Sequence, residues 1–238
     1  PMEYYDLGDK ITAFTTDRTV GRDREKIAEV LSFSRFMYPH QTHTDVVKEV
    51  TEEFFALPEA EQKAMMEGVD AVISRVTDAC IGISTADCIP VLVYDEEHHC
   101  AAAIHAGWKG TVARIVEKAI AAMVKAYESN PASCKAAIGP GISLESFEIG
   151  WEVHEKFVQA GFDMDDVTVV MPTKDGKGTK PHIDLKEINR RQLLSQGVLA
   201  ENIYVSDIDT FTNKQFFSAR REQINDIKCG RILSGFVL

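Results

Sequence analysis

Two residues with metal-ligand chemistry flank a stretch of sequence that folds back on itself. Cys88 begins one apolar run, and His105 ends the next. Only a short polar segment separates the two runs, so we expect an antiparallel hairpin. A two-residue reversal at Glu96 and Glu97 would place Cys88 directly opposite His105, with Cβ atoms roughly 5 Å apart. A thiolate and an imidazole at that separation can hold one metal ion.

The residues beside this pair are typical of a site for a polar substrate. Asp87 precedes Cys88, and Gly107 follows His105 shortly before an expected helix that begins at Thr111. Glycine lets the backbone approach a ligand closely, and the first turn of a helix offers free N–H groups. A single buried cysteine is more often an inert apolar residue, an interpretation that we keep for the other four, Cys80, Cys100, Cys134 and Cys229.

A few amphipathic helices and many short strands must position these residues. Apolar spacings of three and four predict helices at 24–31, 58–66, 111–129, 152–160 and 185–196. Runs rich in β-branched and aromatic residues predict strands at 11–16, 46–50, 71–75, 89–94, 100–105, 135–138, 167–171, 202–205, 215–219 and 232–237. Because helices and strands do not alternate regularly, we expect an α/β (α+β) layered fold of mixed, largely antiparallel sheets flanked by helices, within one domain 1–238.

The composition argues against several classes of partner. With 26 basic and 37 acidic residues, the net charge of -11 repels phosphate backbones and anionic membrane surfaces, so we expect no nucleic-acid or membrane partner. No apolar run approaches the roughly 20 residues of a membrane-spanning helix. The 5 cysteines form no Cys-x-x-Cys pair and follow no signal peptide, which favours reduced thiols in a cytoplasmic protein. Composition leaves both a monomer and a homodimer open.

A series of short motifs follows in a fixed order along most of the chain. These are Gln41-Thr-His43, Asp70-Ala-Val-Ile-Ser74, Thr85-Ala-Asp-Cys88-Ile-Pro90, Ala103-Ile-His105-Ala-Gly-Trp-Lys-Gly110, Ala137-Ile-Gly-Pro-Gly-Ile142, Phe147-Glu-Ile-Gly150, Asp184-Leu and Phe216-Phe-Ser-Ala-Arg-Arg221. In this order they resemble the YfiH-type family, also called the laccase-domain or multicopper polyphenol oxidase family. Members of that family have been described as zinc-dependent purine nucleoside enzymes, and the resemblance implies a YfiH-like fold.

The resemblance implies that His43, Cys88 and His105 are the metal ligands. It supplies His43, because spacing alone leaves His40 as an equal alternative. Three nitrogen and sulfur ligands leave the fourth position of zinc open, which is the catalytic arrangement. Zinc is therefore the expected cofactor, with copper as the alternative.

The resemblance also implies a reaction and two substrates, a purine nucleoside and phosphate. The reaction is phosphorolysis of adenosine, inosine, guanosine or methylthioadenosine, with adenosine deamination as a possible second activity in which Asp87 would shuttle the proton. Arg220 or Arg221, and more weakly Lys109, could hold phosphate, and Glu148 could orient a substrate group. Such arginines are equally often structural ion-pair residues.

Three departures from the family pattern concern the substrate loops. The Gly/Ser-rich segment that is usual after the first strand is shortened, because Thr16 reaches Arg22 to Arg24 within a few residues. Lys109 stands where an arginine is usual, and Asp209 precedes Thr210 where a cysteine is common.

Three other functions stay open at this point. A copper-dependent polyphenol oxidase is disfavoured by only 7 histidines and no His-x-His pair. A metal-free hydrolase or deamidase would use Cys88 as a nucleophile activated by His105. A noncatalytic regulatory protein could keep the same scaffold.

Overall fold

A six-stranded sheet forms the centre of the molecule and carries two of the three candidate ligands at one end. The computed structural model describes all residues 1–238. The strand order in this sheet is β12 (Ile203–Val205), β9 (Cys134–Ile138), β7 (Ile89–Asp95), β8 (Cys100–Ala106), β5 (Ala71–Ser74) and β4 (Val47–Val50). The inner strands pair antiparallel, whereas the two outer pairs, β12 with β9 and β4 with β5, are parallel.

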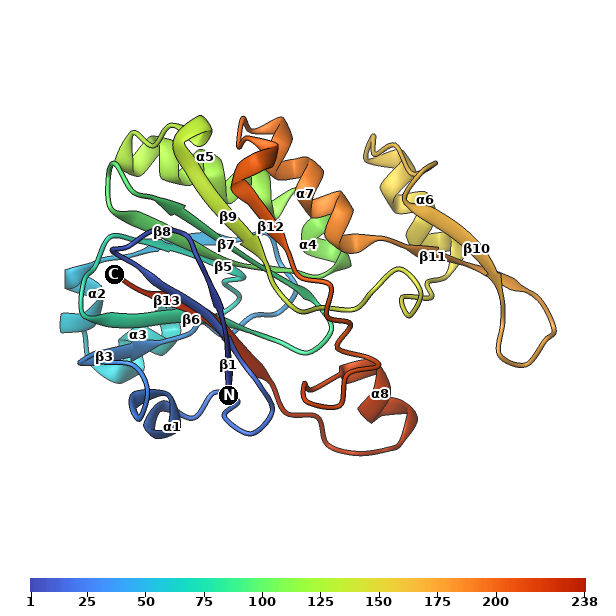
Figure 1. Ribbon diagram of the computed structural model, residues 1–238, viewed down its shortest axis with the longest axis horizontal. Helices are drawn as coiled ribbons and strands as arrows, with labels where there is room; N and C mark the ends of the chain where they lie inside the picture. The colour runs from blue at the N-terminus through green and yellow to red at the C-terminus, as the bar shows by residue number, and fades with distance from the viewer.

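A five-stranded sheet lies beneath one face of the first, and helices cover the other face (Figure 1). The second sheet has the order β1 (Met2–Tyr5), β2 (Thr12–Thr16), β13 (Ile232–Val237), β6 (Ala79–Thr85) and β3 (Arg35–Met37). The covering helices are α4 (Trp108–Val112), α5 (Ile115–Tyr127) and α7 (Leu185–Ser195). The molecule thus has a layer of helices above two stacked sheets.

Alternate residues of β7 face the two neighbouring layers. Val91 and Val93 pack in the core beneath the helices, whereas Leu92 and Tyr94 pack between the two sheets. This follows from the two-residue period of a strand, and it leaves β7 buried on both faces. A strand buried on both faces reads as an unbroken apolar run, which is why this one was recognisable in the sequence.

The remaining elements lie around these layers. They are α1 (Arg24–Ala28), α2 (Glu52–Ala56), α3 (Glu59–Met65), α6 (Trp151–Gln159), α8 (Ala219–Ile224), the hairpin of β10 (Thr168–Pro172) with β11 (Thr179–Ile183), and short 3-10 turns at Pro131–Ser133 and Ala200–Asn202. The hairpin of β10 and β11 projects away from the two sheets beside α6 (Figure 1). No helix combines the length and the apolar character that a membrane span needs.

The predicted fold class is confirmed. Both large sheets are mixed, and seven of the ten strand pairings are antiparallel. Helices flank the sheets instead of alternating with every strand, as expected from their irregular spacing in the sequence.

The single helix predicted at 111–129 is wrong, because two helices occupy this region. Arg114 takes a left-handed conformation (φ 62°, ψ 43°) that ends α4 and starts α5. Its guanidinium donates to the carbonyl oxygen of Ala160 at 3.0 Å and lies 4.1 Å from the centre of the Phe162 ring. Thr111 does not cap a helix start; its hydroxyl donates back to the carbonyl of Gly107 within α4. These tertiary contacts leave no mark on the apolar spacing.

The strand predicted at 215–219 is also wrong. Residues 215–218 form a turn, a bend and irregular chain, and α8 begins at Ala219 because the Ser218 hydroxyl accepts a hydrogen bond from the Arg221 N–H. The prediction missed β1, β3, β6, β11, α2 and α8. All seven residues of β6 are buried, so the sequence of this strand lacks the alternation of polar and apolar residues. Its central residue is Gly82, which is a weak β-former. Glycine is needed there because a Cβ would lie 2.7 Å from the Ser234 carbonyl oxygen.

Candidate metal centre

The hairpin of β7 and β8 has a different register from the predicted one. His105 pairs with Pro90, so Cys88 is not directly opposite His105. Cys88 lies two residues before Pro90, just ahead of the first residue of β7. Because residues two apart along a strand point the same way, the shift keeps the sulfur and the imidazole on one side of the sheet. The predicted proximity therefore holds, although the predicted pairing is wrong.

The turn between the two strands explains the shift. It contains four residues, 96–99, instead of the two that we expected. The Asp95 carboxylate accepts the backbone N–H of His98 at 3.3 Å and lies 2.7 Å from its Nδ1. His99 adopts a left-handed conformation with φ 47°. A glutamate pair suits the favoured two-residue turns poorly, so the longer reversal is the better fit.

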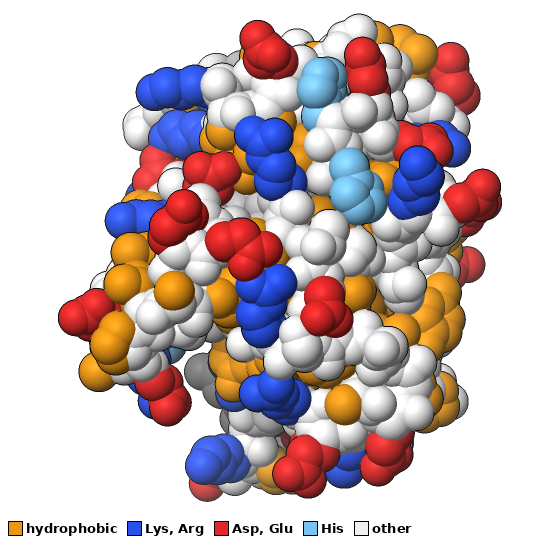
Figure 2. Space-filling view, turned by 90° about the vertical axis from the view of Figure 1, so that its left-hand side faces the viewer, with side chains coloured by type: hydrophobic (Ala, Val, Ile, Leu, Met, Phe, Trp, Pro, Cys, Tyr) orange, Lys and Arg blue, Asp and Glu red, His pale blue; other side chains and the backbone are white.

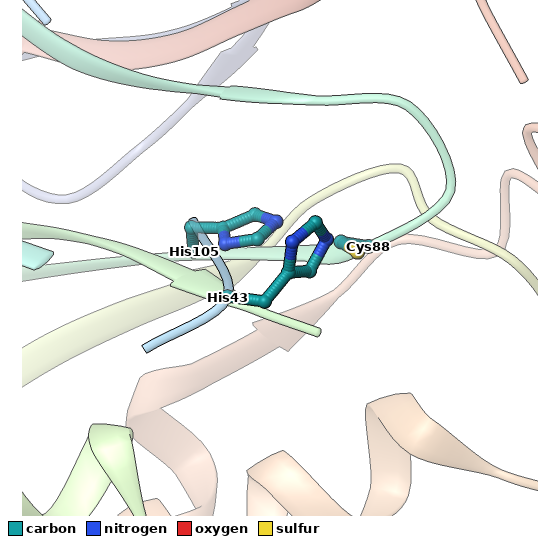
Figure 3. Close-up of side chains that lie close together, drawn as sticks. All are labelled: His43, Cys88 and His105. Carbon is teal, nitrogen blue, oxygen red and sulfur yellow. The ribbon is translucent and has the colours of Figure 1, made fainter. Parts of the chain in front are cut away.

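Three side chains from separate parts of the sequence converge at one end of this hairpin. The donor atoms of His43, Cys88 and His105 all lie within 4.8 Å of one another. Figure 3 shows the two rings and the sulfur side by side, with His43 coming from the loop between β3 and β4. The ring centres of the two histidines are 5.2 Å apart at 71°. His40, the alternative to His43, instead places its Nδ1 2.7 Å from the exposed Glu67 carboxylate.

Asp70 holds both histidines and is the residue that the sequence reasoning missed. Its Oδ2 accepts hydrogen bonds from Nδ1 of His105 at 2.7 Å and from the backbone N–H of His43 at 3.1 Å. Its Oδ1 accepts from the N–H of Thr42 and the hydroxyl of Thr44. Because Nδ1 of His105 is bonded to Asp70, Nε2 is the nitrogen of this ring that can bind a metal ion. The sequence offered a weak signal, since Asp70 is a carboxylate directly before an apolar strand.

The loop that carries His43 is anchored at a second point. The Gln41 side chain donates to the carbonyl of Ser84 at 2.6 Å and accepts the N–H of Ser84 at 2.7 Å. His43 has a left-handed φ of 65°, a conformation that costs free energy in a non-glycine residue. The two anchors, on β6 and on Asp70, hold this conformation and fix the position of the imidazole.

The charges of the cluster favour a thiolate. Burial acts to raise the pKa of Cys88, but His105 and then His43 outweigh it and lower the pKa to about 6. Burial acts to lower the pKa of His105, but the Cys88 thiolate and Asp70 outweigh it and raise the pKa to about 9. For Asp70 too, burial is opposed by the hydrogen bond from His105 and by those from the loop, and the pKa is lowered. Without metal, the pair is therefore a thiolate beside an imidazolium.

Gly107 leaves room for the cluster. A Cβ at this position would lie 3.0 Å from Sγ of Cys88 and 3.2 Å from Cδ2 of His43. Those distances are shorter than ordinary van der Waals contact, so a side chain here would press on two donor side chains. We predicted that the backbone approaches a ligand closely at Gly107. In the structure, the missing side chain leaves room for the side chains of Cys88 and His43.

The donor set fits a divalent metal ion. Two imidazoles and one thiolate are ligands that both zinc and copper accept, and three protein ligands match the open arrangement of catalytic zinc sites. A carboxylate also orients the His105 ring, as is usual for a histidine that binds a metal ion. The other five histidines are not gathered with further ligand residues into a second cluster of three or more donors: His40, His98, His99, His154 and His182.

The Asp87 carboxylate is not part of this cluster. It accepts hydrogen bonds from the hydroxyls of Thr210 (2.8 Å) and Ser218 (2.9 Å) and from the backbone N–H of Arg220 (2.8 Å). Asp87 is buried and has a left-handed φ of 86°. It thus ties the turn before Cys88 to the C-terminal segment, a contact that suits an anchor better than the predicted proton shuttle.

The four predicted substrate-binding residues do not line the cleft beside the cluster. The Arg220 guanidinium donates to the carbonyl of Glu148 at 2.6 Å, and the Glu148 carboxylate lies 3.6 Å from the Lys180 ammonium. The Arg221 guanidinium donates to three backbone carbonyls of residues 210–216. Lys109 is exposed on α4, with its ammonium 5.7 Å from the Trp108 ring centre. The two arginines brace the C-terminal segment.

A cleft of about 1070 Å³ opens beside the metal-ligand cluster. His43, Cys88 and His105 line it, together with residues from the loop before α1, from β3 and from α2 and α3. Three arginines that the sequence reasoning did not select also line it: Arg22, Arg24 and Arg231. No motif marks them in the sequence, because they come from two separate segments that only the fold brings together.

The chain is similar to proteins with assigned activities and to a solved structure. It is 44% identical over 201 residues to a purine nucleoside phosphorylase of Bacteroides thetaiotaomicron, covering 84% of this chain and 72% of that protein. It is 40% identical over 198 residues to adenosine deaminase RL5 of an unknown prokaryotic organism, covering 83% and 72%. The crystal structure of the hypothetical protein YfiH of Bacillus licheniformis superposes with a TM-score of 0.86 at 25% identity, covering 100% of this chain and 96% of that one.

A family model described as multi-copper polyphenol oxidoreductase laccase matches residues 4–238. This match spans almost the whole chain, and it agrees with the order of motifs and with the layered fold. The protein therefore belongs to the multi-copper polyphenol oxidoreductase laccase family, the family that its motifs resemble.

Proposed function

We propose that this protein is a zinc-dependent enzyme that cleaves the N-glycosidic bond of purine nucleosides with phosphate. The observation that carries the proposal is the convergence of His43, Cys88 and His105 beside a cleft large enough for a nucleoside. The names of the related proteins support the substrate class, since one is a purine nucleoside phosphorylase and another an adenosine deaminase.

The residues around the centre have separate tasks in this proposal. A zinc ion bound there would act as a Lewis acid on a substrate oxygen or nitrogen. Asp70 keeps the His105 ring and the His43 loop in position, so that the donors need little rearrangement when the metal binds. Gly107 keeps the space beside the sulfur free of side-chain atoms.

Hydrolytic deamination of adenosine is the second candidate activity. The similarity to an adenosine deaminase favours it, and an open coordination position is what water activation requires. Because the Asp87 carboxylate is bonded to Thr210 and Ser218, another group or a water would have to carry the proton.

An assay of the purified protein with a panel of nucleosides, with and without phosphate, tests the proposal. We expect a free purine base to be released only when phosphate is present, and the release to be lost in Cys88→Ala. Cys229→Ala is the matched control, since Cys229 also lines the cleft but is not in the cluster. Deamination would appear as inosine formed from adenosine without phosphate. No product from any nucleoside would reject the proposal.

Metal analysis and thiol labelling separate the other functions. One copper or more per chain with a visible absorption band, together with phenol oxidation, would favour the oxidase. Rapid labelling of Cys88 that chelators do not change would favour the metal-free nucleophile. A bound metal with no turnover would favour the noncatalytic protein.

A further inference from the structure

Three arginines with no carboxylate partner line the cleft beside the metal-ligand cluster. Arg22, Arg24 and Arg231 form no salt bridge, although the protein carries 37 acidic residues against 26 basic ones. In a chain with a net charge of -11, three guanidinium groups without a carboxylate partner at one cavity indicate that the cavity binds a negatively charged group.

The other charged groups of the cleft are already paired. Lys63 lies 3.1 Å from the Glu59 carboxylate, and the His40 ring lies 2.7 Å from the Glu67 carboxylate. All four belong to the wall formed by α3 and the segment after β3. The side of the molecule that carries α2 and α3 has acidic and basic side chains intermixed and shows no broad basic surface (Figure 2).

Each of these guanidinium groups keeps most of its hydrogen-bonding capacity. Arg22 donates to the Ser84 hydroxyl at 3.4 Å, Arg24 to the Ser34 carbonyl at 3.0 Å, and Arg231 to the carbonyl of the preceding glycine at 2.9 Å. A guanidinium has five N–H donors, so each arginine retains donors without a protein acceptor. Arg221 differs, because three backbone carbonyls accept its N–H groups, and Arg220 does not line the cleft.

The fold connects Arg22 and Arg231 to the metal-ligand cluster. The loop of Arg22 packs on the segment of Arg231, where a Cβ on Gly21 would lie 3.3 Å from the Arg231 carbonyl oxygen. Arg22 and Gln41 both bond to Ser84, and Gln41 lies two residues before the ligand His43. Arg22, Arg231 and the donor atoms therefore belong to the same part of the cavity wall, whereas Arg24 donates to Ser34, which lies beside Asp78 at the opposite end of β6 from Ser84.

We propose that Arg22 and Arg231 bind a phosphate group in this cleft, in place of the predicted Arg220 and Arg221. The inference rests on the proposed phosphorolysis for its substrate. Arginine suits this task because its planar guanidinium can bind two oxygens of one phosphate at once. The arginines hold the phosphate beside the nucleoside that the metal centre contacts.

The reaction balances with phosphate as the nucleophile. A phosphate oxygen forms a bond to C1′ of the ribose, and the bond from C1′ to the purine nitrogen breaks. The electron pair of that bond stays on the purine nitrogen, which takes up the proton that phosphate releases. The products are ribose 1-phosphate and the free base, and the arginines neutralise the charge of the phosphate throughout.

Calorimetric titration of the zinc-loaded protein with inorganic phosphate tests the assignment without any turnover. Arg22→Gln and Arg231→Gln are expected to weaken phosphate binding by about tenfold or more each, as loss of a hydrogen bond to a charged group does. Arg24→Gln should change it little, because the Arg24 guanidinium lies at Ser34, away from Ser84. Lys177→Gln is the matched control, because it removes one positive charge from the exposed turn after β10. Zinc content and melting temperature are measured on every variant, and Arg22→Lys and Arg231→Lys retain the charge if a glutamine variant unfolds.

The source of the phosphate group is distinguished by a second titration with adenosine 5′-monophosphate. If free phosphate binds more tightly than the nucleotide, and more tightly still when adenosine is present, the arginines form a site for phosphate as cosubstrate. If the nucleotide binds and free phosphate does not, they form a site for a phosphorylated nucleoside. Both supporting results require Arg22→Gln and Arg231→Gln to bind more weakly than wild type.

The inference and the proposed function can fail separately. Phosphate-dependent base release that is unchanged in both Arg22→Gln and Arg231→Gln would overturn the arginine site and leave the function standing. Phosphate binding that depends on the arginines, without turnover of any nucleoside, would overturn the function and leave the site. A wild-type protein that binds neither phosphate nor the nucleotide would overturn the site.

Discussion

Asp70 and His105 are joined twice across neighbouring strands. The backbone N–H of His105 donates to the Asp70 carbonyl at 2.8 Å, and its Nδ1 donates to the Asp70 carboxylate at 2.7 Å. The same carboxylate accepts the N–H of His43, so one buried aspartate orients one histidine of the cluster on β8 and the other in the loop after β3. Geometry at the centre is thus set before any metal binds.

Replacing Asp70 by asparagine should weaken the metal site. Both carboxylate oxygens accept hydrogen bonds, so an amide N–H₂ would face at least one donor. We expect metal affinity to fall by about 10- to 100-fold, measured by competition with a chromogenic chelator. Asp45→Asn, in the same loop but bonded to Lys118 at the surface, should leave affinity unchanged. Equal affinities for the two variants would contradict the orienting role.

The Cys88 thiol should ionise well below the ordinary pH for cysteine. Its pKa of about 6 means that the thiolate fraction, and with it the alkylation rate of metal-free protein, rises through pH 6 and is near its plateau at pH 8. Burial raises the pKa of Cys80, Cys100 and Cys134, so these three should react slowly. Iodoacetamide labelling with mass spectrometry, in a Cys229→Ala background, measures the rate.

Two outcomes of the labelling experiment are informative. A midpoint near pH 9 would show that the histidines do not stabilise the thiolate. Protection by added zinc that a chelator reverses would support Cys88 as a ligand, because a bound sulfur cannot attack the reagent.

The Cys88 and His105 pair should also make the stability of metal-free protein depend on pH. The lowered pKa of Cys88 contributes stability that is lost as pH falls through about 6, and the raised pKa of His105 contributes stability that is lost as pH rises through about 9. We therefore expect the melting temperature to be highest between these values. Cys88→Ser should flatten the profile, and an unchanged profile in this variant would contradict the assignment.

Replacing Gly107 by alanine should disturb the centre without broad unfolding. The added Cβ would press on Cys88 and His43, which we expect to cost about 1–3 kcal/mol. Metal content and base release should both fall. Gly178→Ala is the matched control, because no atom lies within 4 Å of a Cβ there. Full metal occupancy in Gly107→Ala would show that the cluster can move aside.

Asp87→Ala separates an anchor from a proton shuttle. Loss of the carboxylate leaves the buried Thr210 and Ser218 hydroxyls without their acceptor, so we expect unfolding free energy to fall by about 1–3 kcal/mol. Asp165→Ala, at an exposed position, is the control. A large fall in kcat with an unchanged melting temperature would instead support the shuttle.

The sequence by itself determined the elements whose signals are local. The apolar runs that became β7 and β8 are buried on both faces, and α7 begins where the Asp184 side chain accepts the Glu187 N–H. The ordered motifs also identified the family and the His43, Cys88 and His105 set, which the fold then brought together. The ligand roles of these residues, and a single domain over 1–238, stay predictions.

Tertiary structure decided the register of the β7–β8 hairpin, the pKa shifts of Cys88 and His105, and which residues line the cleft. A four-residue turn shifted the hairpin, and a left-handed Arg114 divided a helix through contacts with Ala160 and Phe162, which are distant in sequence. The same holds for Asp70, whose carboxylate meets His105 only because β5 pairs with β8. Apolar patterns record which faces are buried, whereas hydrogen bonds and ion pairs depend on which segments become neighbours, and only the folded chain fixes that.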